Sequence, residues 1–185
     1  MKIIPTSSTT TMNTLLLKDK LTIVIPCKNE GVNIYECLGF ISKQRGIAGT
    51  RVIISDNSDD EESLRWIYQT ESDYKYSLKI EVIDGGFPAQ ARLNGSKLVT
   101  TPYMLFLDAD IFLIDNATIK ECMDIIQKQS LELVTCKFRC EGRYSFVFPI
   151  FEFFRDLSVR YSPCAIGGFM LFEYDTFIRV GGFND

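Results

Sequence analysis

The sequence predicts an α/β fold with a mostly parallel central sheet. Short apolar runs, typical of buried strands, alternate along the chain with stretches whose apolar residues follow helical spacing. Several of these runs end at acidic residues, which would meet at one edge of a parallel sheet because right-handed crossovers place the strand ends together. Together these observations favour a Rossmann-like three-layer sandwich, in which helices cover both faces of the sheet.

Composition narrows the class of protein. The chain has 185 residues, 46% apolar and 24% charged, which is enough for one globular domain. A net charge of −4 with scattered Lys and Arg argues against a nucleic-acid-binding face. The chain has no His, so His-based catalytic triads and His-ligated zinc are excluded. No apolar stretch approaches the ~20 residues of a membrane span.

The six cysteines predict a reducing compartment. None of them forms a Cys-x-x-Cys pair, and most lie inside apolar runs. We therefore expect reduced core residues and a cytoplasmic protein. The cysteines are Cys27, Cys37, Cys122, Cys136, Cys140 and Cys164.

The domain is expected to span 21–185, after a flexible leader at 1–20 that shows no clear periodicity. A first strand is predicted at 21–26. The helix after it is predicted from the spacing of Ile34, Leu38 and Ile41. Its predicted capping box is formed by Asn33 and Glu36.

Two further strand and helix units follow. A strand at 51–56 ends in an acid, and the capping pattern of Ser58 and Glu61 precedes a helix. The buried stripe of that helix is predicted to be Leu64, Ile67 and Tyr68. A strand at 78–83 alternates more, which places it nearer an edge of the sheet.

The rest of the chain continues the alternation. Pro88 is predicted in the first turn of a helix that reaches about Leu98. The phenylalanine-rich segment 146–154 is expected to be core. The remaining predicted elements are a strand at 103–107, a helix around 119–126, a strand at 131–138, a strand to Phe172 after a glycine turn, and a helix at 174–180.

The run at 103–107 leads directly into Asp108-Ala109-Asp110. Two carboxylates at the end of a buried strand are suited to bind a hard divalent cation, Mn²⁺ or Mg²⁺. Taken alone, the pair could be a polar strand end without function. Likewise, Glu30 could interact with the amino end of the following helix, and Asp56 could be a turn residue.

A metal would explain how such an acidic edge binds a phosphate ligand. At ~4 Å and an effective dielectric of ~20, each pair of like unit charges costs about 4 kcal/mol. Asp56, Asp108 and Asp110 would therefore repel a nucleotide diphosphate. A divalent cation bridges acids and phosphate oxygens, and it stabilises charge on a departing diphosphate. These features suggest metal-assisted transfer from a nucleotide-activated donor.

At this point the sequence resembles the inverting glycosyltransferases of family 2, which have the A-type nucleotide-sugar-binding (GT-A) fold. The resemblance covers the chain from about residue 21 to its end, and it depends on several short motifs in the expected order. They are LTIVIPCKNE at 21–30, VIISDNS at 52–58, ARLNG at 91–95, LFLDAD at 105–110, the pair Gly167-Gly168 and VGGFND at 180–185.

The resemblance implies roles for these positions. Asp56 would accept a hydrogen bond from the base, uracil in a UDP-linked donor, and Arg92 would lie near the ribose or diphosphate. Asp108 and Asp110 would hold the metal, and Gly167 and Gly168 would lie on the acceptor side. The implied nucleotide-sugar site consists of Pro26, Asn29, Glu30, Asp56, Arg92, Asp108 and Ala109.

Two departures from the family pattern matter. Leu93 stands where the family has Asn, which could loosen a donor contact. The family's catalytic base lies beyond the Gly-Gly-Phe segment, so we expect a chain that is incomplete at its C-terminus, with Asp185 as a weak candidate for the base. The acceptor would be a glycan, lipid or other hydroxyl compound. A downstream segment could bring the protein to the inner face of the membrane.

Three alternatives remain at this stage. A phosphatase of the haloacid dehalogenase type also has an Asp-x-Asp after an apolar strand, but that strand lies near the start of its domain, not fourth. A non-catalytic fragment could bind donor and metal without turnover. A nucleotidyltransferase would need a Gly-rich, Lys-bearing phosphate loop, and none is visible.

Overall fold

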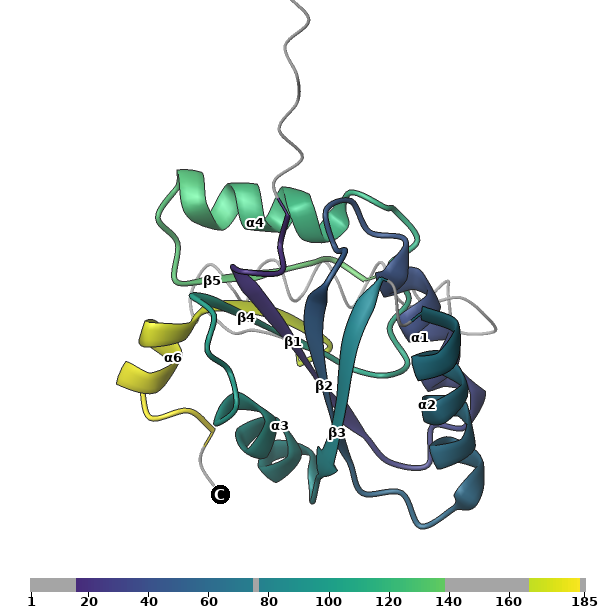
Figure 1. Ribbon diagram of the computed structural model, residues 1–185. Helices are drawn as coiled ribbons and strands as arrows, with labels where there is room; N and C mark the ends of the chain where they lie inside the picture. Colours follow the sequence, from purple (N-terminus) through teal and green to yellow (C-terminus); the bar gives the residue numbers. More distant parts are fainter. Residues whose placement is uncertain (1–15, 75–76, 139–166, 184–185) are drawn as a thin grey trace, which may run out of the picture.

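The computed structural model describes residues 16–74, 77–138 and 167–183 (Figure 1). Most of the predicted leader, Cys140, Cys164, the phenylalanine-rich segment 146–154 and Asp185 lie outside these ranges.

Six strands form one sheet with the order β3-β2-β1-β4-β6-β5. The pairings β1–β2, β2–β3 and β1–β4 are parallel, whereas β6 runs antiparallel to both β4 and β5. The mostly parallel sheet of the prediction is therefore confirmed. The strands are β1 (Leu21–Cys27), β2 (Thr50–Asp56), β3 (Leu78–Asp84), β4 (Tyr103–Leu107), β5 (Leu133–Thr135) and β6 (Phe169–Glu173).

Helices lie on both sides of this sheet, which gives the three layers predicted from the sequence. In Figure 1, α1 and α2 lie together on one side, while α3 and α6 lie on the other. Buried residues of α4 belong to the same core cluster as those of α1 and α2. The helices are α1 (Val32–Ser42), α2 (Glu61–Tyr74), α3 (Pro88–Ser96), α4 (Thr118–Lys128) and α6 (Tyr174–Arg179).

The alternation of side chains along each strand divides the core into two parts. In β4, Leu105 and Leu107 join the cluster under α1, α2 and α4. Met104 and Phe106 join the cluster on the opposite face, together with Phe177 of α6. Strands buried on both faces explain the unbroken apolar runs of the sequence.

Several local predictions are confirmed. β3 is an edge strand, as its alternation indicated. Pro88 stands in the first turn of α3, although that helix ends at Ser96 and not near Leu98. The predicted strand 131–138 is shorter, because only Leu133–Thr135 pairs with β6.

The two predicted helix caps are wrong. α1 follows Gly31, which has a φ of 53° and donates its N–H to Ser63 Oγ at 3.0 Å, so α2 fixes the start of α1. Asn33 makes no cap and donates to Glu30 Oε2 at 3.4 Å. For α2, Asp60 Oδ1 accepts the N–H of Ser63 at 2.8 Å, which is the role predicted for Ser58.

The predicted buried stripe of α2 is also partly wrong. Ile67 is buried, but Tyr68 is 64% exposed. The buried positions beside Ile67 are the small polar residues Ser63 and Thr70. Both hydroxyls find hydrogen-bond partners, Ser63 on Asp60 and Thr70 on the carbonyl of Trp66, so their burial is compensated.

Candidate functional site

A cavity of about 300 Å³ lies at the carboxyl edge of the parallel strands. Its lining comes from the loop after β1, the turn after β3, the first turns of α3 and the end of β4. The strand order reverses between β1 and β4, which is where open α/β sheets bind ligands. Six of the predicted residues line it: Pro26, Glu30, Arg92, Asp108, Ala109 and Asp110.

Asp108 comes directly after the last residue of β4 and is held from two sides. Its backbone N–H donates to Gly168 O at 3.0 Å. Its carboxylate forms an ion pair with Arg92. Burial raises the pKa of Asp108, the guanidinium of Arg92 opposes that shift, and the charge of Asp110 adds to it. The pKa of Asp108 is thus set by opposing effects, burial on one side and the ion pair with Arg92 on the other.

Arg92 reaches Asp108 because α3 packs very close to the sheet. A Cβ atom at Gly95 would overlap Val24 Cγ1 and would lie 3.0 Å from Ser55 Oγ, so only glycine fits at this contact. Arg92 Nη1 donates to Pro88 O at 3.4 Å. Its buried Nε has no acceptor among the described residues, which leaves one N–H of the guanidinium unsatisfied.

Asp110 and Glu30 bring two more carboxylates to the cavity. Asp110 is exposed, and no hydrogen bond or ion pair to its carboxylate is found within the described ranges. Burial raises the pKa of Glu30, Asn33 opposes the shift, and the charges of Asp110 and Asp108 add to it. The acids therefore repel one another, and a cation at this point would relieve that repulsion.

The donor set fits a Mg²⁺ or Mn²⁺ ion that keeps other ligands. In the part of the chain that the structure describes, no three His, Cys, Asp or Glu side chains are grouped closely enough to enclose a metal. Mg²⁺ sites commonly use only one or two carboxylates, with water and substrate phosphates as the other ligands. Asp110 has an exposed carboxylate with no hydrogen-bond partner in the described ranges, and together with Asp108 beside it Asp110 matches that type of site.

Asp56 and Asn29 lie beside this cavity and not in its lining. Asp56 Oδ1 accepts a hydrogen bond from Ser58 Oγ at 2.7 Å. Asn29 has a φ of 55°, donates its N–H to the same hydroxyl at 2.9 Å and accepts the N–H of Asp59 at 2.8 Å. These contacts join the loop after β1 to the loop after β2, and they hold Asp56 next to Cys27.

The two predicted glycines are close to the acids. Gly168 O accepts the N–H of Asp108, and a Cβ at Gly167 would lie 3.6 Å from Arg92 Nη2. The sequence missed Cys27, Lys28 and Phe87, which also line the cavity. The position of Phe87, between a Gly-Gly turn and a proline at a helix start, was the available signal for that residue.

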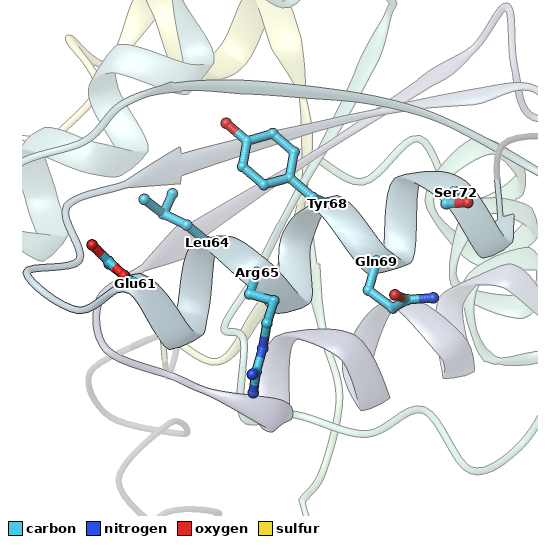
Figure 2. Close-up of a pocket in the computed structure, with 6 residues that line it drawn as sticks. All are labelled: Glu61, Leu64, Arg65, Tyr68, Gln69 and Ser72. Carbon is cyan, nitrogen blue, oxygen red and sulfur yellow. The ribbon is translucent and has the colours of Figure 1, made fainter.

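A second hollow, of about 510 Å³, lies along the exposed side of α2 (Figure 2). Its lining comes from that one helix, and Figure 2 shows the side chains of Tyr68 and Arg65 pointing away from each other. It is larger than the cavity at the sheet edge, but no second element and no pair of acids contributes to it. The smaller cavity is therefore the candidate site.

The described helices do not include one that is long and apolar enough to cross a membrane. The four cysteines within the described ranges are free, as expected.

The solved structures that resemble this chain include glycosyltransferases. A mannosyltransferase, PcManGT from Pyrobaculum calidifontis, in complex with GDP-Man and Mn²⁺, has a TM-score of 0.67 at 22% identity and covers 89% of this chain and 47% of its own. TarS from S. aureus, in complex with UDP-GlcNAc, has a TM-score of 0.57 at 17% identity, over 87% of this chain and 47% of its own. These likenesses confirm the fold.

Comparison of sequences identifies the family. A teichoic acid poly(glycerol phosphate) polymerase from Staphylococcus epidermidis is 33% identical over 93 residues, which is 50% of this chain and 13% of that protein. The chain thus spans less than half the length of each of these relatives. The family model described as glycosyl transferase family 2 matches residues 22–177, and the chain therefore belongs to that family.

Proposed function

We propose that this chain is the donor-binding part of an inverting glycosyltransferase, which moves a sugar from a nucleotide-diphosphate sugar to an acceptor hydroxyl. The observation that supports it best is the cavity at the switch point of a family 2 fold, where Arg92 and three acids converge. UDP is the proposed nucleotide, and a glycan, lipid or other hydroxyl compound is the proposed acceptor. Family membership favours this reaction over the phosphatase alternative.

The order of the strands in the sheet suggests where the base, the diphosphate and the sugar of the donor bind. Asp56 ends β2 and is proposed to accept a hydrogen bond from the base. Next along the sheet come Pro26, Asn29 and Glu30 after β1, and then Asp108, Ala109 and Asp110 after β4. Gly167 and Gly168 precede β6, so the transferred sugar and the acceptor are proposed to lie at that end.

Asp110 and Asp108 are proposed to hold Mn²⁺ or Mg²⁺. When bound, such an ion supplies positive charge that neutralises the diphosphate. Arg92, half-buried beside Asp108, adds a fixed positive charge, and its Nε–H has no acceptor among the described residues. Since these groups are committed to charge neutralisation, we assign the catalytic base to none of them. Asp185, outside the described residues, stays a candidate, as does a residue of a longer protein.

Linked binding of metal and nucleotide tests this proposal. Because the acids repel a diphosphate without a cation, titration calorimetry with UDP should give tight binding in Mn²⁺ and weak or no binding in a chelator. Asp110→Asn should lose most of the Mn²⁺ effect, while Asp115→Asn, an exposed acid farther along the same loop, should keep it. Equal UDP affinity with and without Mn²⁺ would contradict the metal role.

A second test concerns the base. Asp56→Asn should weaken UDP binding by roughly 1.5–3 kcal/mol, because a charge-assisted hydrogen bond is replaced by a weaker one. The neighbouring Asp84→Asn, at the exposed end of β3, is the matched control and should leave affinity unchanged. If the melting temperature of Asp56→Asn falls while the folded fraction binds UDP normally, Asp56 is structural.

A further inference from the structure

Phe87 is the most exposed large hydrophobic side chain in the part of the chain that the structure describes. It is 84% exposed, against 73% for Ile114 and 64% for Tyr68. A single exposed phenylalanine is not unusual in itself. Its position is informative, because Phe87 lines the cavity that also contains Arg92, Asp108 and Asp110.

The backbone around Phe87 is held firmly, so its exposure does not come from a loose loop. Gly85 donates its N–H to Asp56 O at 2.7 Å, and its own carbonyl accepts from Asn94 Nδ2 at 2.9 Å. A Cβ at Gly85 would lie 2.8 Å from Ser55 O, so the turn is in direct contact with β2. On the other side, Phe87 O accepts the N–H of Ala91 at 2.8 Å.

The same contacts place Phe87 between two ends of the proposed site. Its turn rests on the backbone of Asp56, at the end proposed for the base. The cavity lining continues from Phe87 to the acids after β4, at the end proposed for the diphosphate. The backbone of Phe87 is thus fixed between these ends, and its ring exposes an apolar face where a ligand would pass.

Nothing within the described residues covers that face with another ring, since Phe87 takes part in none of the aromatic pairs found there. A flat, uncharged group would cover it well, because aromatic rings favour offset stacking with such groups. The base of the nucleoside is the flat and uncharged part of a nucleotide-sugar, whereas the diphosphate belongs with Arg92 and the acids.

We propose that Phe87 packs against the nucleoside part of the donor and contributes to its recognition, an inference that rests on the proposed function. Phe87 then selects nucleoside diphosphates over other metal-bound diphosphates. Asp56 recognises hydrogen-bonding groups of the base, and Phe87 supplies apolar contact area.

The experiment measures binding to the full chain in Mn²⁺ by calorimetry, with UDP and inorganic pyrophosphate as the two probes. Phe87→Ala should weaken UDP binding about 5- to 150-fold, the range expected for loss of one base–aromatic stack. Phe87→Tyr keeps the ring and should stay within about twofold of the unchanged chain. Pyrophosphate should bind equally to all variants, because it has no nucleoside.

Tyr68→Ala is the matched control, since it removes an exposed aromatic side chain from α2, outside this cavity. It should leave both affinities unchanged. Melting temperatures should be the same for all variants, because both rings are exposed.

Four outcomes would overturn the inference. UDP binding to Phe87→Ala as tight as to the unchanged chain shows that the ring makes no useful contact. Equal losses for UDP and pyrophosphate show a disturbed metal site. A loss seen only with a UDP-sugar, and not with UDP, assigns the ring to the sugar. An unchanged chain that binds neither probe in Mn²⁺ overturns the proposed function and this inference with it.

Discussion

The face of the sheet under α1, α2 and α4 buries large aliphatic side chains, whereas α3 meets the other face through small ones. Ile34, Leu38 and Ile41 of α1 are fully buried on the first face. On the second, the residues of α3 that are buried are Ala91, Gly95 and Ser96. The first arrangement removes much apolar surface from water, and the second allows a close approach of helix and strand.

The two faces therefore have different roles: the first stabilises the fold, and the second positions the side chain of Arg92. Burial of a Leu or Ile side chain contributes about 1.5–3 kcal/mol, so the first face supplies most of the driving force for folding. Small residues contribute little area, but they fix the height of α3 above β1 and β2. That height lets Arg92 reach Asp108 at the end of β4.

The largest expected effect tests the first face. Leu38→Ala should lower the free energy of unfolding by about 2–5 kcal/mol, because it leaves a cavity in a fully buried position. The folded fraction should keep its UDP affinity, since Leu38 does not line the site. Urea denaturation and calorimetry measure the two quantities.

Ile125→Ala is the control for this prediction, because Ile125 lies on α4 and is 41% exposed. It should change stability by no more than about 0.5 kcal/mol. A large loss of UDP affinity in the folded fraction of Leu38→Ala would contradict this division, because it would show that the first face also determines binding.

A smaller effect tests the second face. Gly95→Ala should lower the free energy of unfolding by up to about 2 kcal/mol, because an overpacking cost of roughly 1–3 kcal/mol is only partly offset by a gain of about 1 kcal/mol in helix propensity. UDP affinity should also fall, because a displaced α3 moves Arg92. Gly39→Ala, in α1, is the control: its Cβ would lie 3.0 Å from the Tyr74 hydroxyl, which is the end of a side chain and can move. Affinity that stays unchanged in Gly95→Ala would show that the height of α3 does not set the position of Arg92.

The smallest effect concerns the reactivity of two thiols on the first face, Cys27, which is buried, and Cys136, which is partly exposed. Burial, and then the charge of Asp56, raise the pKa of Cys27 to about 12, while a hydrogen bond from Cys122 lowers the pKa of Cys136. The Sγ atoms of Cys122 and Cys136 are 3.4 Å apart. A lower pKa gives more thiolate at a given pH, so iodoacetamide at pH 8 should modify Cys136 before Cys27.

Peptide mass spectrometry after timed alkylation distinguishes the two thiols. Between pH 7 and pH 9 the alkylation rate of Cys27 should rise continuously, since this range lies below its pKa. The alkylation rate of Cys136 should level off at a lower pH than that of Cys27. In urea the two rates should become similar. Faster modification of Cys27 in the folded chain would contradict the prediction.

The sequence predicted the layers of this fold because apolar runs and helical spacing report burial directly. The alternation of 78–83 even identified β3 as an edge strand. The helix starts were not predictable in the same way. Gly31 donates to Ser63 of α2, and that contact depends on how two helices lie side by side. A motif of two residues on one helix contains no information about it.

The candidate site was predicted in part. Strand ends carrying acids had to meet at one edge, and Asp108, Asp110 and Glu30 do line one cavity. Asp56, which was expected in the same crevice, lies beside it because its carboxylate is turned to Ser58. The ion pair of Arg92 with Asp108 was not predicted, because it depends on the packing height of α3. The exposure of Phe87 was missed for a similar reason, since it follows from the contact between Gly85 and β2. UDP as the donor nucleotide, inversion and a cytoplasmic location stay predictions.

The reversed direction of β6 has a consequence for how the protein is made. The N–H of Asp108 is held by Gly168, and β4 has a free edge until β6 pairs with it. A ribosome releases residues in order, at about 5–20 per second. Residues 21–107 can therefore form a parallel sheet several seconds before residues 168–173 arrive. During that interval β4 is an unpaired edge strand, the kind of surface that other chains can join. A chaperone that shields β4 until β6 is synthesised would raise the yield of folded protein.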